Sequence, residues 1–73
     1  MKLTVTEEQL SELYKRVDIA CKCFPTLRYG QAMFNEAMNM WPEFVNTLRG
    51  TEDDCFYKDT KVKAFLSHFV IEK

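Results

Sequence analysis

The chain has 73 residues, of which 47% are hydrophobic and 14% aromatic, and its formal net charge is −1. A chain of this length buries only about 60% of the surface that it exposes when unfolded, which excludes a second domain and predicts one domain over 1–73. The near-neutral charge argues against a basic nucleic-acid binder and against an acidic nucleic-acid mimic, so nucleic acid is not an expected partner.

A first helix is predicted to begin after Thr6, because Thr6 and Gln9 together form a capping box. Apolar residues then recur at three- and four-residue spacing as far as Phe24. Pro25 should end the helix, since the residue before a proline is biased away from the α region. Ile19 departs from the apolar stripe and is expected to be exposed.

Thr26 is positioned to cap a second helix over 27–41, with Gly30 in its first turn. Glycine in a helix costs about 1 kcal/mol relative to alanine but lets another backbone approach closely, so we expect tight packing at Gly30. Pro42 fits the first position of a short third helix, and Gly50 lies where a glycine would end that helix.

The last segment is predicted to be a helix capped by Asp59. Its apolar stripe comprises Val62, Phe65, Leu66, Phe69 and Val70. Strands are not convincingly indicated, since the only β-like runs are three or four residues at each end. These patterns predict an all-α fold, a small bundle of three principal helices plus one short helix.

Three cysteines without an apolar leader, and the absence of any run near the ~18 apolar residues of a membrane span, predict a reduced cytoplasmic protein without membrane partners. The ligand types of a Cys3His zinc site are present in Cys21, Cys23, Cys55 and His68. However, Cys21 and Cys23 would point to opposite faces of a helix unless it ended between them. His68 is the only partner available to a nucleophilic thiol, and the acidic residues lack EF-hand spacing. We therefore predict no metal, no cofactor and no enzymatic activity.

Two arginines, a hydroxyl and two tyrosine rings would suit a pocket for a phosphate-bearing base, because guanidinium pairs with phosphate and tyrosine stacks on bases. The same arginines could instead pair with the acidic loop, as Arg49 would with Asp53 or Asp54. The spacing leaves open whether Arg28 and Arg49 converge. The predicted ligand or partner contacts are Arg28, Tyr29, Arg49, Thr51, Asp54 and Tyr57.

Two blocks of the chain read Arg28-Tyr29-Gly30-Gln31-Ala32-Met33-Phe34-Asn35 and Gly50-Thr51 followed by Asp54-Cys55-Phe56-Tyr57. These blocks resemble segments of a family of small uncharacterised phage and bacterial proteins. Family members carry Arg-x-Gly-Gln-Ala-x-Phe-Asn and Gly-Thr-x-x-Asp-Pro-Phe-Tyr segments, so this chain differs by having Cys55 where proline is usual. The resemblance implies a phage or prophage origin, and small early phage proteins commonly bind and disable a host component.

The matched positions also suggest a structural clasp around the loop after Gly50. Gln31 and Asn35 lie one turn apart on one helix face, where they could hydrogen-bond the loop backbone, and Phe56 with Tyr57 would anchor the loop in the core. The predicted clasp residues are Gly30, Gln31, Asn35, Gly50 and Phe56.

Small size, surplus aromatic residues and the lack of catalytic motifs predict a non-enzymatic helical interaction protein. Its expected partner is a host protein, which it would modulate or inhibit as a phage-encoded antagonist of host defence, in the bacterial cytoplasm. The alternative prediction is a binder or sponge for a small nucleotide-like ligand that acts as a homo-oligomer, because one short chain can hardly enclose a pocket.

Overall fold

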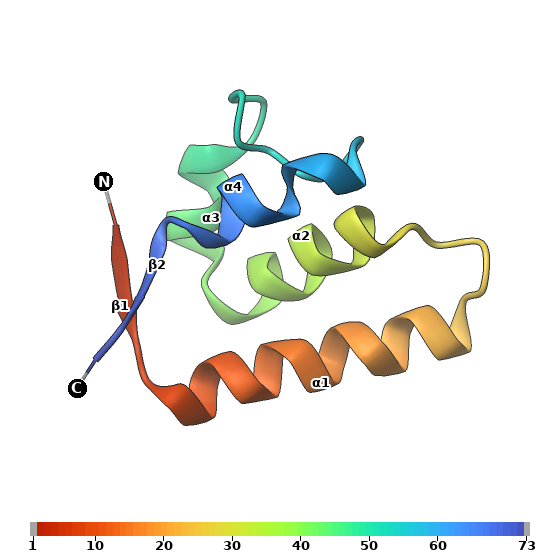
Figure 1. Cartoon of the computed structure of the whole chain (residues 1–73), viewed down its shortest axis with the longest axis horizontal. Coiled ribbons are helices and arrows are strands. Elements are labelled where there is room, and N and C mark those ends of the chain that lie inside the picture. The colour runs from red at the N-terminus through yellow and green to blue at the C-terminus, as the bar shows by residue number, and fades with distance from the viewer. Residues whose placement is uncertain (1, 73) are drawn as a thin grey trace.

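The computed structural model describes residues 2–72, which are mostly helical (Figure 1). In chain order the elements are β1 (Leu3–Val5), α1 (Glu7–Cys23), α2 (Tyr29–Met40), α3 (Pro42–Leu48), the 3-10 turn η1 (Asp59–Lys61), α4 (Val62–Leu66) and β2 (Phe69–Ile71). The two strands pair in parallel, with Leu3 opposite Phe69 and Val5 opposite Ile71. The prediction of a purely all-α fold is therefore wrong in this respect.

Helix α1 begins and ends where the sequence predicted. The Thr6 hydroxyl accepts a hydrogen bond from the Gln9 N–H at 3.0 Å, and the Gln9 side chain accepts one from the Thr6 N–H at 2.8 Å, which completes the capping box. Leu13 and Val17 of its apolar stripe are buried. Ile19 lies off that stripe and is 52% exposed, as expected.

Helix α2 begins two residues later than predicted, and Thr26 does not cap it. The N-cap is Arg28, whose side chain makes no capping hydrogen bond. Instead, the carboxylate of Asp59 accepts a hydrogen bond from the Gly30 N–H at 2.9 Å. Asp59 therefore caps α2, which lies 29 residues earlier in the chain. The prediction that Asp59 caps the helix of its own segment is wrong.

Helix α3 follows the proline and glycine signals closely. Pro42 is its first residue, and Gly50 adopts a φ of 77° just beyond its end. This left-handed conformation is the one in which glycine commonly terminates helices, so the predicted boundary is confirmed.

The predicted terminal helix is wrong in its second half. Helix α4 stops at Leu66, and Phe69 and Val70 belong to β2. The β-branched pair that follows Phe69 favours an extended chain, and β1 supplies the backbone partners that a strand needs. Sequence periodicity could not show this, because the partner strand lies at the opposite end of the chain.

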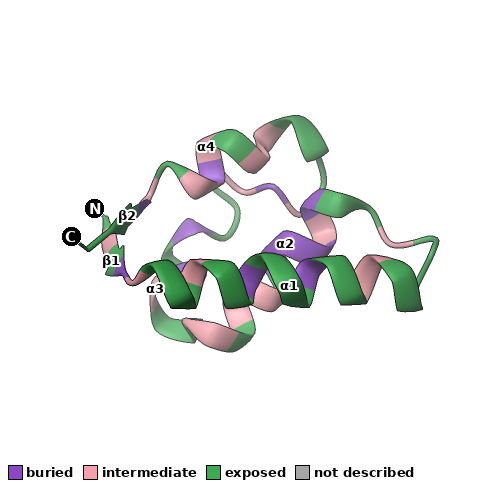
Figure 2. Ribbon diagram, turned by 60° about the horizontal axis from the view of Figure 1, so that its bottom comes forward, coloured by how far each residue is buried: buried purple, intermediate pink, exposed green. Residues whose placement is uncertain are grey.

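Helix α2 lies at the centre of the hydrophobic core. Figure 2 shows that buried residues concentrate on α2 and on the side of α1 that faces it. The Phe65 ring packs against Phe34 and Phe69, with ring centroids 5.7 and 5.4 Å apart, so α4 and β2 close the core. None of the helices within residues 2–72 is both long and apolar enough to cross a membrane.

Candidate functional site

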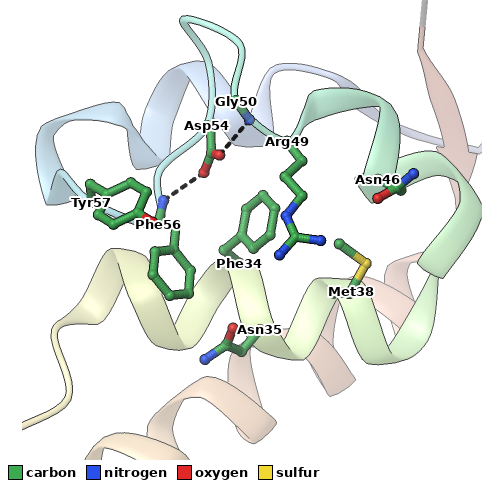
Figure 3. A pocket seen from close by; sticks show the side chains of 9 residues that line it. All are labelled: Phe34, Asn35, Met38, Asn46, Arg49, Gly50, Asp54, Phe56 and Tyr57. Carbon is green, nitrogen blue, oxygen red and sulfur yellow. Dashed lines mark hydrogen bonds between the residues drawn. The ribbon is translucent and has the colours of Figure 1, made fainter.

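An open pocket of about 420 Å³ lies between α2, the end of α3 and the loop that follows it (Figure 3). We call it the Arg49 pocket. Its lining residues are Phe34, Asn35, Met38, Asn46, Arg49, Gly50, Asp54, Phe56 and Tyr57. The pocket therefore combines residues from both sequence blocks that the resemblance highlighted.

Asp54 gives the loop its shape. Its carboxylate accepts hydrogen bonds from the Gly50 N–H at 2.7 Å and from the Phe56 N–H at 2.8 Å. Thr51 acts similarly, since its hydroxyl donates to the Leu48 carbonyl at 2.7 Å and accepts from the Asp53 N–H at 3.3 Å. Both side chains were predicted as binding residues, but their hydrogen bonds hold the loop, and Thr51 does not line the pocket.

Arg28 and Arg49 do not converge on the pocket. The Arg28 guanidinium donates to the Phe56 carbonyl at 2.9 Å and also to the Tyr57 carbonyl. It thus fastens the far end of the loop to the start of α2. Arg49 alone brings a guanidinium to the pocket lining.

The Arg49 side chain extends into the pocket beside Phe34 and Met38 (Figure 3). It is exposed, and it forms neither a hydrogen bond nor an ion pair with any other residue of the described chain. The predicted ion pair with Asp53 or Asp54 is not formed, because the Asp53 carboxylate contacts His68 Nε2 at 2.7 Å. The His68 side chain is 22% exposed at this contact.

Cys55 and Gly30 lie in close contact where the loop packs on α2. The Cys55 side chain is fully buried, and its thiol donates to the Gly30 carbonyl at 3.3 Å. A Cβ at Gly30 would collide with the Cys55 carbonyl oxygen and come within 2.9 Å of Asp59 Oδ1. The prediction of tight packing at Gly30 is confirmed.

Sequence reasoning missed Cys55 as the residue that anchors the loop. Its only signal was its position between Asp54 and two aromatic residues. Burial, with a further contribution from the Asp54 charge, raises the pKa of the Cys55 thiol to about 12. The thiol is therefore protonated at neutral pH and is not an activated nucleophile.

Only one of the two loop aromatics reaches the core. Phe56 is half-buried and meets Phe34 edge to face, with ring centroids 5.8 Å apart. Tyr57 packs against Phe56 at 4.8 Å but remains 72% exposed. The prediction that Tyr57 anchors the loop is wrong, and its ring instead forms part of the pocket rim.

The remaining predicted residues have other surroundings. The side chains of Gln31 and Asn35 form no hydrogen bond within the part of the chain that the structure describes, so they do not bind the loop backbone, although Asn35 lines the pocket. Tyr29 is not a pocket residue. Tyr29 is 44% exposed, and its partial burial, with a smaller contribution from Tyr14 of α1, raises the pKa of Tyr29.

Among residues 2–72, histidine, cysteine and acidic side chains do not gather in any group of three that could hold a metal ion. In particular, Cys55 is buried beside Gly30 while Cys23 is exposed at the end of α1. The Arg49 guanidinium makes the pocket compatible with an anionic group.

Comparison with protein-family models, with curated proteins and with solved structures finds no match to this chain.

Proposed function

We propose that this chain is a non-enzymatic helical interaction protein that binds a host protein through the Arg49 pocket. The observation that carries the proposal is the Arg49 guanidinium, which has no partner among residues 2–72 and lies beside the apolar surface of Phe34 and Met38. Arginine and tyrosine are enriched among the residues that dominate binding energy at protein interfaces. The exposed Tyr57 ring at the pocket rim supplies the second residue of this kind.

The polar groups of the pocket define what the partner should present. Asp54 is its only carboxylate, and both oxygens of that carboxylate already accept backbone hydrogen bonds. Arg49 therefore has bidentate hydrogen-bonding capacity for a carboxylate, while Asn35 and Asn46 add amide donors and acceptors. An acidic residue next to an apolar residue on the partner surface would match this arrangement.

The wider role follows the resemblance to small phage and bacterial proteins. We propose that the chain is phage-encoded, acts in the host cytoplasm and modulates or inhibits a host protein, with defence proteins as the first candidates. Its buried thiol and loop-holding carboxylates support a binding role in preference to catalysis, because neither is an activated catalytic group.

The test is affinity capture from a bacterial lysate with the tagged chain and with its Arg49→Ala variant. We expect the wild-type chain to retain one host protein reproducibly, and Arg49→Ala to weaken its binding by about 30-fold or more, as for an interface hot spot. Arg16→Ala is the matched control, since Arg16 is an exposed arginine that pairs with Glu12 on α1. Failure to recover a host protein, or equal losses in both variants, would contradict the proposal.

A second function, binding of a small nucleotide-like ligand, is favoured by the volume of the same pocket and by the presence of Arg49 and Tyr57 in its lining. Its volume of about 420 Å³ lies within the roughly 300–1,000 Å³ typical of small-molecule sites. Arg49 could pair with a phosphate and the Tyr57 ring could stack on a base. The pocket is open, so this function requires a second subunit to cover the ligand.

Thermal unfolding with a panel of nucleotides distinguishes the two functions. A ligand present at 100 times its dissociation constant stabilises the folded chain by about 2.7 kcal/mol. The stabilisation should disappear in Arg49→Ala and persist in Arg16→Ala. No shift with any nucleotide would eliminate the second function and leave the first unaffected.

A further inference from the structure

The parallel sheet has backbone N–H and C=O groups that form no hydrogen bond with any other residue among 2–72. Within the pair, the Leu3 N–H donates to the His68 carbonyl at 2.8 Å and the Glu72 N–H donates to the Val5 carbonyl at 2.7 Å. Because consecutive residues of a strand direct their backbone groups to opposite edges, this register turns the N–H and C=O groups of Phe69 and Ile71 away from β1.

Apart from its length of three residues, the outer edge of β2 lacks the features with which proteins protect exposed strand edges. Charged residues, prolines and bulges are the usual protection. The strand reads Phe69-Val70-Ile71 and contains none of them. Val70 is 42% exposed and Ile71 is 37% exposed, so apolar side chains accompany the unpaired backbone. Figure 1 shows both strands at one end of the molecule, beside the two chain ends.

We propose that β2 pairs with β2 of a second copy of this chain, antiparallel about a twofold axis through Val70. In this register Phe69 of one copy lies opposite Ile71 of the other, and each such pair exchanges two backbone hydrogen bonds. Val70 then faces its own counterpart in the close, non-hydrogen-bonded position, where two β-branched side chains pack together. The two sheets become one four-stranded sheet.

A second copy fits this edge for three reasons. The residues whose backbone groups face outward, at 69 and 71, are related to each other by the twofold axis, so the strand is self-complementary. Each sheet has only two strands, so the outer edge of β2 has no further strand of the same sheet to pair with. The net charge of −1 gives little repulsion between copies.

The proposal is tested by measuring mass against concentration in sedimentation equilibrium. Because three residues provide a small interface, we expect a weak dimer whose average mass rises from 8.7 kDa toward twice that value as the chain approaches about 1 mM. A mass that stays at the monomer value over this range would overturn the proposal and leave the β2 edge to some other partner.

Proline substitution identifies the edge. Ile71→Pro removes an outward N–H without removing a hydrogen bond to β1, so it should weaken dimerisation at least tenfold. Thr4→Pro is the matched control, since Thr4 directs its N–H to the outer edge of β1, and it should dimerise like the wild type. Dimerisation of Ile71→Pro at wild-type strength would overturn the assignment.

Val70→Lys tests the twofold axis without altering the backbone. It places two lysines opposite each other only in the proposed register, so dimerisation should weaken and should recover partly as salt screens the repulsion. Circular dichroism confirms that each variant remains folded. Wild-type dimerisation of a folded Val70→Lys variant would contradict the register.

Discussion

The loop after α3 and the terminal sheet join distant parts of the chain in different ways. The loop is held mainly by side chains that bond to backbone groups, through Arg28, Asp54 and Asp59. The sheet is held by backbone groups that bond to each other across β1 and β2. Both regions bury an apolar side chain in the core, Cys55 in the loop and Val5 in the sheet, with at most 1% exposed.

The difference determines what each region leaves available. The Asp54 carboxylate and the Arg28 guanidinium bond to backbone groups of the loop, and they leave Arg49 and Tyr57 available to bind side chains of a partner. A two-stranded sheet can pair only its inner edge, and it leaves backbone groups on its outer edge for another strand. The loop therefore suits recognition of side chains, and the sheet suits extension by a strand.

The largest expected effect is at the contact between Gly30 and Cys55. Gly30→Ala introduces a Cβ that meets a backbone carbonyl, so it should lower the free energy of unfolding by about 3 kcal/mol. Gly50→Ala is the control, because space is available there and only its positive φ is strained, which costs about 1 kcal/mol. Urea unfolding measures both. Equal costs would show that the loop does not pack on α2 as tightly as described.

Alkaline pH tests the burial of Cys55. The folded thiol has a pKa of about 12, above its usual value of 9.0, so the unfolded chain loses this proton first as pH rises. Stability should therefore be fully present below about pH 9 and fall by about 2 kcal/mol between about pH 9 and pH 11. Cys55→Ala should be less stable at neutral pH but should lack this part of the decline. An unchanged pH dependence in Cys55→Ala would contradict the assignment.

The two aromatic residues of the loop, Phe56 and Tyr57, should contribute very differently to stability. Phe56→Ala should lower the free energy of unfolding by about 2 kcal/mol, less than a fully buried phenylalanine, because the ring is half-buried against Phe34. Tyr57→Ala should change it by less than about 0.5 kcal/mol, since the ring is largely exposed. Thermal unfolding of both variants checks this. A large loss of stability in Tyr57→Ala would mean that the ring is part of the core.

The smallest expected losses of stability come from removing one side chain in each region that hydrogen-bonds to a backbone group, Asp59 near the loop and Lys2 at the sheet. Asp59→Ala should cost about 1 kcal/mol, because it leaves the part-buried Gly30 N–H without its acceptor, and Asp59→Asn should restore part of that loss. Lys2→Ala removes the hydrogen bond from Lys2 to the Ser67 carbonyl in an exposed setting, so it should cost less than about 0.5 kcal/mol. Equal losses of stability in Asp59→Ala and Lys2→Ala would contradict the view that side-chain hydrogen bonds matter more for the loop than for the sheet.

Local sequence signals predicted the elements that depend on neighbouring residues. The capping box at Thr6, the break at Pro25, the start of α3 at Pro42 and the glycine end at Gly50 all appear in the structure. Each depends on atoms within a few residues along the chain. The same signals failed at Thr26 and at the end of α4, where distant segments supply better partners.

The residues of the candidate site were predicted only in part, because the geometry of the site depends on contacts between groups that lie far apart in the sequence. Arg49 and Tyr57 line one pocket as their residue types suggested, whereas Arg28 and Asp54 bond to the loop backbone. Gln31 and Asn35 were expected to hold the loop. That work is shared by Arg28, Asp59 and the buried thiol of Cys55, which had no recognised pattern.

The sequence by itself determined a small, mostly helical chain, the limits of its first and third helices, and the need for a small residue at Gly30. These properties follow from capping chemistry, backbone freedom and apolar spacing, which act over short distances. Only the tertiary structure decided that the two chain ends form a sheet and that Arg49 remains unpaired in a pocket. Those outcomes depend on contacts between residues far apart in the chain, such as the pairing of Leu3 with Phe69, which local patterns do not encode.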